Sequence, residues 1–417
     1  MRLIFCKIKA KEQILKQTGM LFLSQMGLIF LGLGIKYIQT GKLGDIQYGE
    51  YALFVSVTSI ALIIFRFGIF ASLQVLLANS KSKNQDKGLI GAGIVLTFCI
   101  ALLFGIAMFA FSGIINDLLN TEIGAALAAS SLLCMVFPFQ NLIGAISTGS
   151  NKIKEGALFN LLPKLVFFIA LIVFIRRKEL DVLSTICMNL ASTLVILIPL
   201  LFRFKPNFGN LGSHIGQILS KTRTYGIHYY FGSLFNQTTY RLDEIFLAYF
   251  HSTVLVGYYS LANLVCTPMV IMSQSLSKAM FKRFAQSNSI HPKVFVFNTL
   301  WLIACIGGLG FLVFLFIDLQ YEGYSFSEVL KYVMPLSIAF FFQGLCSPYA
   351  FLAAKSLGKE IRNVAWAEAG LNILGNILLI KEYQIFGAIY SSIAAKAVHF
   401  LALRYYYRKY IREQDIA

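Results

Sequence analysis

Uninterrupted apolar stretches of about 20 residues recur along the whole 417-residue chain, and they restrict its fold more than any other feature. A helix of this length crosses the hydrocarbon core of a bilayer. A transmembrane barrel would instead need short strands with alternating apolar and polar residues. Hydrophobic residues make up 57% of the chain and charged residues 13%, about half the charge of a typical soluble domain. The sequence therefore predicts an all-α integral membrane protein.

About twelve such stretches can be placed along the chain. The predicted spans are 17–38, 48–78, 89–113, 124–149, 157–175, 180–202, 224–250, 253–277, 294–317, 329–354, 361–380 and 384–403. The N-terminus is basic and then apolar, but the apolar part is longer than the core of a signal peptide and no cleavage site follows it. We therefore expect this segment to be retained as the first span.

Lysine and arginine are distributed unevenly over the segments that join these spans. One set of alternate segments holds 25 of the 36 basic residues, and the other set holds seven. Cytoplasmic loops of membrane proteins carry such an excess of basic residues. The distribution predicts an even number of spans with both termini in the cytoplasm, and only the basic run 176–178 departs from it. It also accounts for the net charge of +17 without nucleic acid as a partner.

The chain is predicted to consist of two six-helix bundles. The longest polar connection, 203–223, is basic and lies near the midpoint, and the motif at 49–53 (GEYAL) is echoed at 257–261 (GYYSL), about half a chain later. Since both halves begin on the same side, the repeat is parallel, with a pseudo-two-fold axis along the membrane normal, a geometry suited to alternating access. We expect an N-terminal bundle over 1–202, a cytoplasmic linker over 203–223, and a C-terminal bundle with a cytoplasmic tail over 224–417.

Polar side chains inside the predicted spans are the candidate functional residues, because an ionisable group at bilayer depth usually faces a partner or a wet cavity. In the seventh span, Arg241 and Glu244 are three residues apart and can pair on one helix face. Alternatively, Arg241 meets an anionic substrate while Asp243 or Glu244 exchanges protons or ions. Both interpretations remain open at this point.

Other intramembrane polar groups gather in the last two predicted spans. Glu368, Asn372 and Asn376 follow one another at four-residue spacing and form one polar stripe, and Lys396 and His399 share a face of the next span. These side chains either line a cleft or hold the bundle together by interhelical hydrogen bonds. Arg66 and Lys164 lie in the second and fifth spans, and Lys164 is close enough to the cytoplasmic end to snorkel. Interior bases of this kind suit phosphate oxygens.

Three stretches of the sequence carry a family resemblance. They are LGDIQYGEY at 43–51 with RFGI at 66–69, RLD at 241–243 with VGYYS at 256–260, and AK at 354–355 with NILGN at 372–376 and FGAI at 386–389. In this order and spacing they resemble the polysaccharide transporter family, the O-antigen and related flippases of the MATE/MOP superfamily. Gln74 stands in a region where family patterns often have a basic residue.

The resemblance implies a transporter in a bacterial cytoplasmic membrane that moves an undecaprenyl-diphosphate-linked oligosaccharide, such as an O-antigen repeat unit, from the cytoplasmic to the outer leaflet. The implied energy source is an ion gradient, since the family has no ATPase domain and this chain has no phosphate-binding loop motif. Membrane lipids and other glycan-assembly proteins are the expected partners. No cofactor is expected, and no cysteine pair has metal-ligand spacing.

The predicted site residues follow from combining the resemblance with the intramembrane charges. The candidates for substrate binding are Arg66, Lys164, Arg241, Asn372, Asn376, Lys396 and His399. The candidates for ion or proton coupling are Asp243, Glu244 and Glu368.

Two other functions compete with this interpretation. A drug or cation antiporter of the same superfamily would favour a cleft with acidic and aromatic residues. A membrane polysaccharide polymerase or glycosyltransferase usually carries a substantial extracytoplasmic loop or a catalytic motif. The longest outer loops here have only about ten residues, and no catalytic motif is found. We therefore expect a transporter and not an enzyme.

Overall fold

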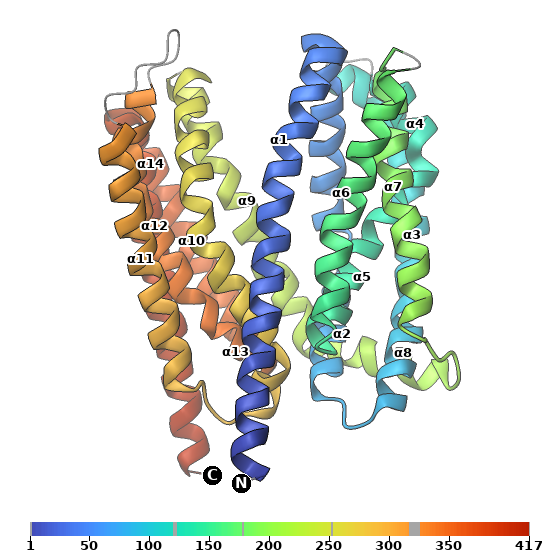
Figure 1. Ribbon diagram of the computed structural model, residues 1–417, viewed down its shortest axis with the longest axis vertical. Helices are drawn as coiled ribbons and strands as arrows, with labels where there is room; N and C mark the ends of the chain where they lie inside the picture. The colour runs from blue at the N-terminus through green and yellow to red at the C-terminus, as the bar shows by residue number, and fades with distance from the viewer. Residues whose placement is uncertain (1, 120–122, 177–178, 252, 317–325, 417) are drawn as a thin grey trace. The chain divides into compact units, whose positions relative to one another are not determined.

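The computed structural model describes residues 2–119, 123–176, 179–251, 253–316 and 326–416, and every regular element in these ranges is helical (Figure 1). The helices are α1 Arg2–Ile64, α2 Ile69–Asn79, α3 Lys83–Leu119, α4 Ile123–Cys134, α5 Val136–Gly149, α6 Ile153–Ile175, α7 Val182–Arg203, α8 Leu211–Lys221, the π-helical turn Thr222–Gly226, α9 Ile227–Phe250, α10 Thr253–Gln286, α11 Pro292–Phe316, α12 Phe326–Cys346, the 3-10 turn Ser347–Tyr349, α13 Ala350–Ala354 and α14 Gly358–Ile416. The predicted all-α class is confirmed for these residues.

The helices pack into two compact units. One unit comprises Met20–Gly226, and the other comprises Met1–Gly19 together with Ile227–Ala417. We refer to them as the 20–226 unit and the 227–417 unit. Each has its own apolar core, which includes Phe54 and Phe104 in the first and Leu302 and Val333 in the second.

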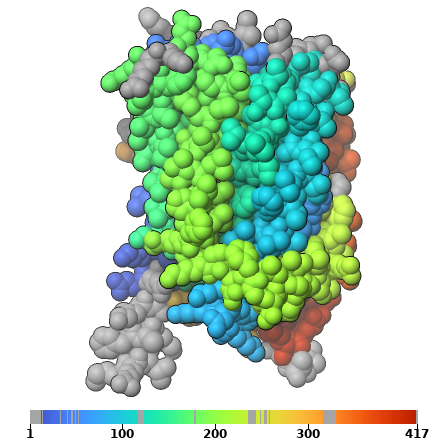
Figure 2. All heavy atoms as spheres, turned by 90° about the vertical axis from the view of Figure 1, so that its right-hand side faces the viewer, coloured from blue at the N-terminus to red at the C-terminus, as the bar shows by residue number. Residues whose placement is uncertain are grey.

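In the 20–226 unit, α3 packs against α4, α5 and α8, while α2 packs against α5 and α6 against α7. The short helix α8 differs from the others because it lies across the lower end of the upright helices of this unit (Figure 2). Its apolar side is turned inward: Ile218 is fully buried, and Leu211 and Ile215 pack against the core. The basic linker expected from the sequence thus contains an amphipathic helix.

In the 227–417 unit, α9 packs against α14, and α12 packs against both α10 and α14. Gln384 has non-helical backbone angles (φ 51°, ψ −127°) and divides α14 into two limbs, 358–383 and 385–416. Gly387 permits the sharp reversal, because a Cβ atom there would lie 2.7 Å from the backbone nitrogen of Ile380. The limbs then pack closely, and Ser391 Oγ donates a hydrogen bond to the carbonyl of Asn372 at 2.8 Å.

Large apolar side chains cover the outer faces of the helices. On α3, Phe98, Leu102, Ile106 and Phe109 are 42–64% exposed and repeat at helical spacing, which makes one continuous stripe. The polar Thr97 is instead fully buried and donates to the carbonyl of Gly93 at 2.7 Å. Apolar groups outside and satisfied polar groups inside are what a lipid solvent requires. The chain is therefore a multi-pass membrane protein.

Length and composition qualify seven helices in the described residues as membrane spans, or nine if each of two bent pairs is one span. The helix α1 contains the span Ile14–Leu43 and the first limb, Leu53–Ile64, of one bent pair. The helix α14 is counted once, although Gln384 divides it. The total of twelve spans therefore stays a prediction.

The predicted span 48–78 is broken in the structure. The chain bends by 61° between α1 and α2, where Phe67 and Gly68 have φ angles of 46° and 73°. Gly68 is required on two grounds: its backbone angle favours glycine, and a Cβ atom would collide with the carbonyl of Gly226. As a result Arg66, expected within a continuous helix, lies in the break between α1 and α2.

The predicted span 124–149 is also bent, by 41° between α4 and α5. Pro138 stands four residues after Cys134, the last residue of α4. Because proline has no N–H group, the carbonyl of Cys134 loses its helical partner, and the helix can bend there.

Candidate functional site

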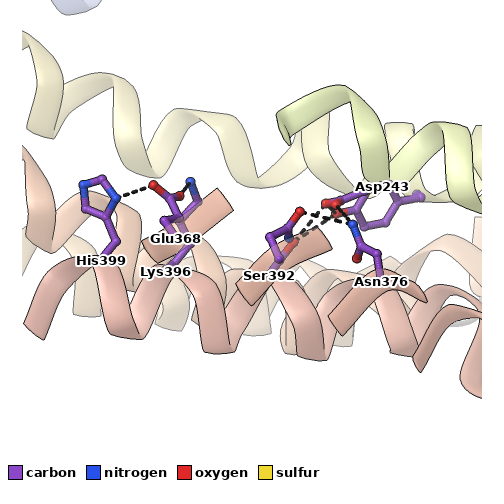
Figure 3. Close-up of polar contacts among 8 residues, drawn as sticks. Asp243, Glu368, Asn376, Ser392, Lys396 and His399 are labelled. Atoms are coloured by element: carbon purple, nitrogen blue, oxygen red, sulfur yellow. Dashed lines mark hydrogen bonds and ion pairs between the residues drawn. The ribbon is translucent and has the colours of Figure 1, made fainter. Parts of the chain in front are cut away.

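A buried carboxylate in the 227–417 unit collects polar groups from three helices. Asp243 on α9 accepts hydrogen bonds from Tyr259 Oη of α10 at 2.7 Å and from Ser392 Oγ of the second α14 limb at 2.9 Å, both through Oδ2. Its Oδ1 accepts from Asn376 Nδ2 of the first α14 limb at 2.6 Å (Figure 3). Asn372 Oδ1 in turn accepts from Asn376 Nδ2 at 3.1 Å. We call these five residues the Asp243 cluster.

The Asp243 cluster is chemically unusual because its carboxylate has neutral neighbours. Asp243 is 6% exposed, and its hydrogen-bond partners among the described residues are a phenol, a hydroxyl and an amide. Three donors compensate for part of the cost of burying a charge. The side-chain amide oxygen of Asn376, Oδ1, is buried with no hydrogen-bond partner in the described part of the chain. An unused acceptor beside a buried carboxylate can receive a proton-bearing group or serve as an oxygen ligand for a small cation.

A second group on α14 shares one carboxylate between two bases. Glu368 on the first limb pairs with the ammonium of Lys396 through Oε1 and with Nδ1 of His399 through Oε2, and both bases lie on the second limb (Figure 3). Since a carboxylate oxygen accepts, Nδ1 of His399 carries the hydrogen. The side chain of Glu368 is 5% exposed. We call these three residues the Glu368 cluster.

The two clusters are adjacent along the same pair of helix limbs. Glu368, Asn372 and Asn376 follow at four-residue intervals on the first limb, and Ser392 and Lys396 are four apart on the second. Each interval is about one helical turn. The structure thus brings together Asp243, Asn372, Asn376, Glu368, Lys396 and His399, six of the ten predicted site residues, as two neighbouring groups in one unit.

A third polar network lies in the 20–226 unit. Lys164 Nζ on α6 donates to Asn189 Oδ1 on α7 at 3.3 Å, and Asn189 Nδ2 donates to the hydroxyl of Tyr51 on α1 at 3.2 Å. The side chain of Gln39, also on α1, lies beside the same hydroxyl. We call these four residues the Lys164 network. Of these four residues, only Lys164 was predicted from the sequence, because it is the one with a charged side chain.

The other predicted residues are Arg66, Lys164, Arg241 and Glu244, of which Lys164 belongs to the network just described. Arg66 lies in the break before α2, and the carbonyl of its backbone accepts a hydrogen bond from the N–H of Ile69 at 3.2 Å. The side chain of Arg241 is outside the described residues, so its pairing with Glu244 stays a prediction. Glu244 itself is half-buried on α9.

Sequence reasoning missed Tyr259, Ser392, Tyr51, Asn189 and Gln39. Hydroxyl and amide residues are frequent in membrane helices, where they bond to the preceding turn or across helices, so they do not stand out. One signal was present for the two tyrosines: Tyr51 and Tyr259 occupy the same position in the echoed motifs at 49–53 and 257–261.

Comparison with known proteins places this arrangement among transport folds. Residues 14–288 match the model of a family described as polysaccharide biosynthesis protein, whereas no curated protein matches the chain. A solved multidrug resistance MATE family transporter of the MOP superfamily, in an outward-facing conformation, is 11% identical with a TM-score of 0.78, over 98% of this chain and 97% of that chain. A MOP superfamily transporter from Pyrococcus furiosus is 13% identical with a TM-score of 0.78, over 96% of both chains.

A eukaryotic MATE transporter is also similar, with 14% identity and a TM-score of 0.74 over 97% of this chain and 98% of that chain. At these identities the similarity concerns the fold. Nearly the whole chain therefore has the fold of MATE and MOP transporters.

Proposed function

Because the chain belongs to the polysaccharide biosynthesis protein family and has the fold of MOP transporters, we propose that it is a flippase for a lipid-linked oligosaccharide. The cargo is an undecaprenyl-diphosphate-linked repeat unit, of the O-antigen or a similar glycan. It moves from the cytoplasmic to the outer leaflet of a bacterial cytoplasmic membrane by alternating access. The protein works with both termini in the cytoplasm, in agreement with its basic loops.

The observation that carries this proposal is the Glu368 cluster. A lysine and a histidine inside a membrane-spanning unit are expensive to keep, and here one carboxylate compensates for both. A diphosphate offers the same kind of acceptor oxygens as a carboxylate. Glu368 can therefore act as the internal partner of Lys396 and His399 while no cargo is bound, and cargo phosphate can replace it.

Energy coupling is assigned to the acidic residues of the same unit. Among the described residues Asp243 has neutral hydrogen-bond partners and lies beside the side-chain amide oxygen of Asn376, which has no partner there, so within this part of the chain it can hold a proton or a small cation without breaking an ion pair. Glu368 is tied to two bases and Glu244 is half-buried. We assign the coupling ion to Asp243, with Glu244 and Glu368 as secondary candidates.

The experiment is a deletion of the gene in its own host, followed by electrophoresis of the surface glycan. We expect the deletion strain to lose its long surface glycan and the intact gene to restore it. Lys396→Ala and Arg241→Ala should reduce display at a normal protein level. Lys409→Ala is the matched control, because Lys409 is an exposed lysine of α14 whose pair with Glu413 is at the surface and contributes little.

Persistence of the long glycan in the deletion strain, with no second flippase present, would contradict the proposal. Normal display by both Lys396→Ala and Arg241→Ala would remove these two residues from substrate binding. Complementation of flippase mutants with defined repeat units would then identify the sugar that the protein accepts.

One observation favours a second candidate, a drug or cation antiporter. The neutral surroundings of the Asp243 carboxylate would suit an organic cation as well as a metal ion or a proton. Expression in a strain without drug exporters separates the two candidates. An antiporter would raise resistance to lipophilic cations and would lose this effect in Asp243→Asn, whereas a flippase would leave resistance unchanged.

A further inference from the structure

Two tyrosines at the same position of the two echoed motifs lie in buried polar networks of opposite charge. Tyr51 and Tyr259 are the third residues of the motifs at 49–53 and 257–261, and they are 8% and 3% exposed. The hydroxyl of Tyr259 donates to the carboxylate of Asp243. The hydroxyl of Tyr51 accepts from Asn189, which also bonds the ammonium of Lys164. The two echoed motifs thus each place a phenol in a buried network, and the two networks contain opposite charges.

The Lys164 network has more hydrogen-bond donors than acceptors. An ammonium has three N–H groups. In the described part of the chain, Lys164 has one hydrogen bond, to Asn189, and a longer approach to the ring of Phe167, 5.9 Å from its centroid. Gln39 is 2% exposed, and its Nε2 atom has no hydrogen-bond partner in the described part of the chain. The hydroxyl of Tyr51 receives the amide of Asn189, which leaves its own hydrogen available for an acceptor.

We propose that the Lys164 network is a binding site for an anionic oxygen group of the transported head group, either a phosphate oxygen or the carboxylate of an acidic sugar. The identification of the ligand as part of the cargo rests on the proposed flippase function. The preference for an anion rests on the donors of the network itself. The group supplies the lone pairs that Lys164, Gln39 and Tyr51 lack, and one negative charge balances the single ammonium. A cation is disfavoured here because the ammonium of Lys164 would repel it.

The surroundings of the network make such a contact strong and well positioned. The helices α1 and α6 pack closely, since Cβ atoms added to Gly27 and Gly34 would lie 3.0 Å from Leu161 and 3.2 Å from Phe168. An apolar cluster on α1, α6 and the segment leading into α7 lies beside the network, and it consists of Ile35, Leu43, Phe167, Leu171 and Leu180. Apolar walls lower the local dielectric and strengthen a charged hydrogen bond.

Access and availability distinguish this site from the other bases of the protein. Lys164 and Asn189 are half-buried, so the ligand can reach them, whereas Gln39 and Tyr51 form the buried end. Lys396 and His399 already share Glu368, and an anion must displace that carboxylate to bind them. No carboxylate of the described residues pairs with Lys164, so an anion that binds there displaces none of them.

The test is binding to the purified full-length protein in nanodiscs, measured by isothermal titration calorimetry with inorganic pyrophosphate and, separately, with galacturonate. We expect at least one probe to bind, and Lys164→Met to weaken it about tenfold or more, as for a lost hydrogen bond to a charged group. Tyr51→Phe should weaken it about two- to tenfold. Lys164→Arg should retain binding, which separates loss of the charge from loss of folding.

Lys154→Met is the matched control, because Lys154 is an exposed residue at the start of the same helix, α6. Binding of pyrophosphate alone assigns the site to the diphosphate, and binding of galacturonate alone assigns it to an acidic sugar. The proposal is overturned if neither probe binds, or if Lys154→Met weakens binding as much as Lys164→Met. If the deletion strain loses its glycan but Lys164→Met binds the probe normally, the site is refuted and the flippase function stands. If the deletion strain keeps its glycan but Lys164→Met binds the probe weakly, the flippase function is refuted and the site stands.

Discussion

Asp243 accepts buried hydrogen bonds from three side chains of the 227–417 unit. Asp243→Ala would remove the acceptor that Tyr259, Ser392 and Asn376 share, at a cost of about 1–3 kcal/mol for each buried group left unsatisfied. Ser392→Ala removes a single donor and should cost about 0.5–1.5 kcal/mol. We therefore expect thermal unfolding of the purified protein to shift much further for Asp243→Ala than for Ser392→Ala. Equal shifts would show that the hydrogen bonds to Asp243 contribute little.

The same residues show how far a site can be predicted from a sequence. Asp243, Glu368 and Lys396 stand out because a charge within an apolar run is rare and costly. Their partners do not: Ser392 is 149 residues from Asp243, and nothing local connects them. The sequence also suggested that Lys396 and His399 share a face, but not that one carboxylate on the other limb pairs with both.

At the scale of the elements, the break between α1 and α2 depends on Gly68. Gly68→Ala would place a Cβ atom against the carbonyl of Gly226 and would force alanine into a left-handed backbone conformation, which alone costs about 1–2 kcal/mol. We expect a lower unfolding temperature and less folded protein in the membrane, measured by size-exclusion chromatography of a fluorescent fusion. Gly144→Ala is the control, since nothing lies within 4 Å of a Cβ atom there. Equal behaviour of the two variants would contradict the packing argument.

The breaks in the helices differ in how visible they are from the sequence. The reversal at Gln384 was predicted as the start of a span, because Lys381 and Glu382 interrupt the apolar run just before it. The break at Gly68 was not predicted, because hydrophobic residues continue on both sides of Arg66. At this break the chain packs closely against Gly226, which is far away in the sequence. Hydropathy reports where a chain can enter a membrane and not where packing requires it to bend.

At the scale of the whole molecule, the uneven distribution of basic residues predicts the orientation of the chain. In a variant without its seven native cysteines, Lys381→Cys should react with a membrane-impermeant thiol reagent in intact cells. Lys154→Cys should react only after permeabilisation, because it lies in the strongly basic set of loops. Electrophoretic detection of the labelled protein decides between the two orientations, and the opposite pattern would place the termini outside.

The general class of the molecule followed from composition and apolar run length, and the structure confirms an all-helical membrane protein. The family also followed from short motifs, which the match over residues 14–288 confirms. The predicted internal repeat rests on the echo of five residues and stays a prediction. Its physical content, a tyrosine in each unit that anchors a polar network, needed the structure, because the partners of these tyrosines come from other helices.

The sharing of Glu368 by two bases has a consequence for genetics. Loss of the carboxylate alone removes the negative partner that Lys396 and His399 share, which for a buried pair costs about 3–5 kcal/mol, whereas joint loss of the acid and the lysine removes one charge of each sign. A Glu368→Gln strain should therefore acquire second-site suppressors at Lys396 or His399. Substitutions at these three positions should therefore be interdependent: whether one is tolerated depends on which residues stand at the other two.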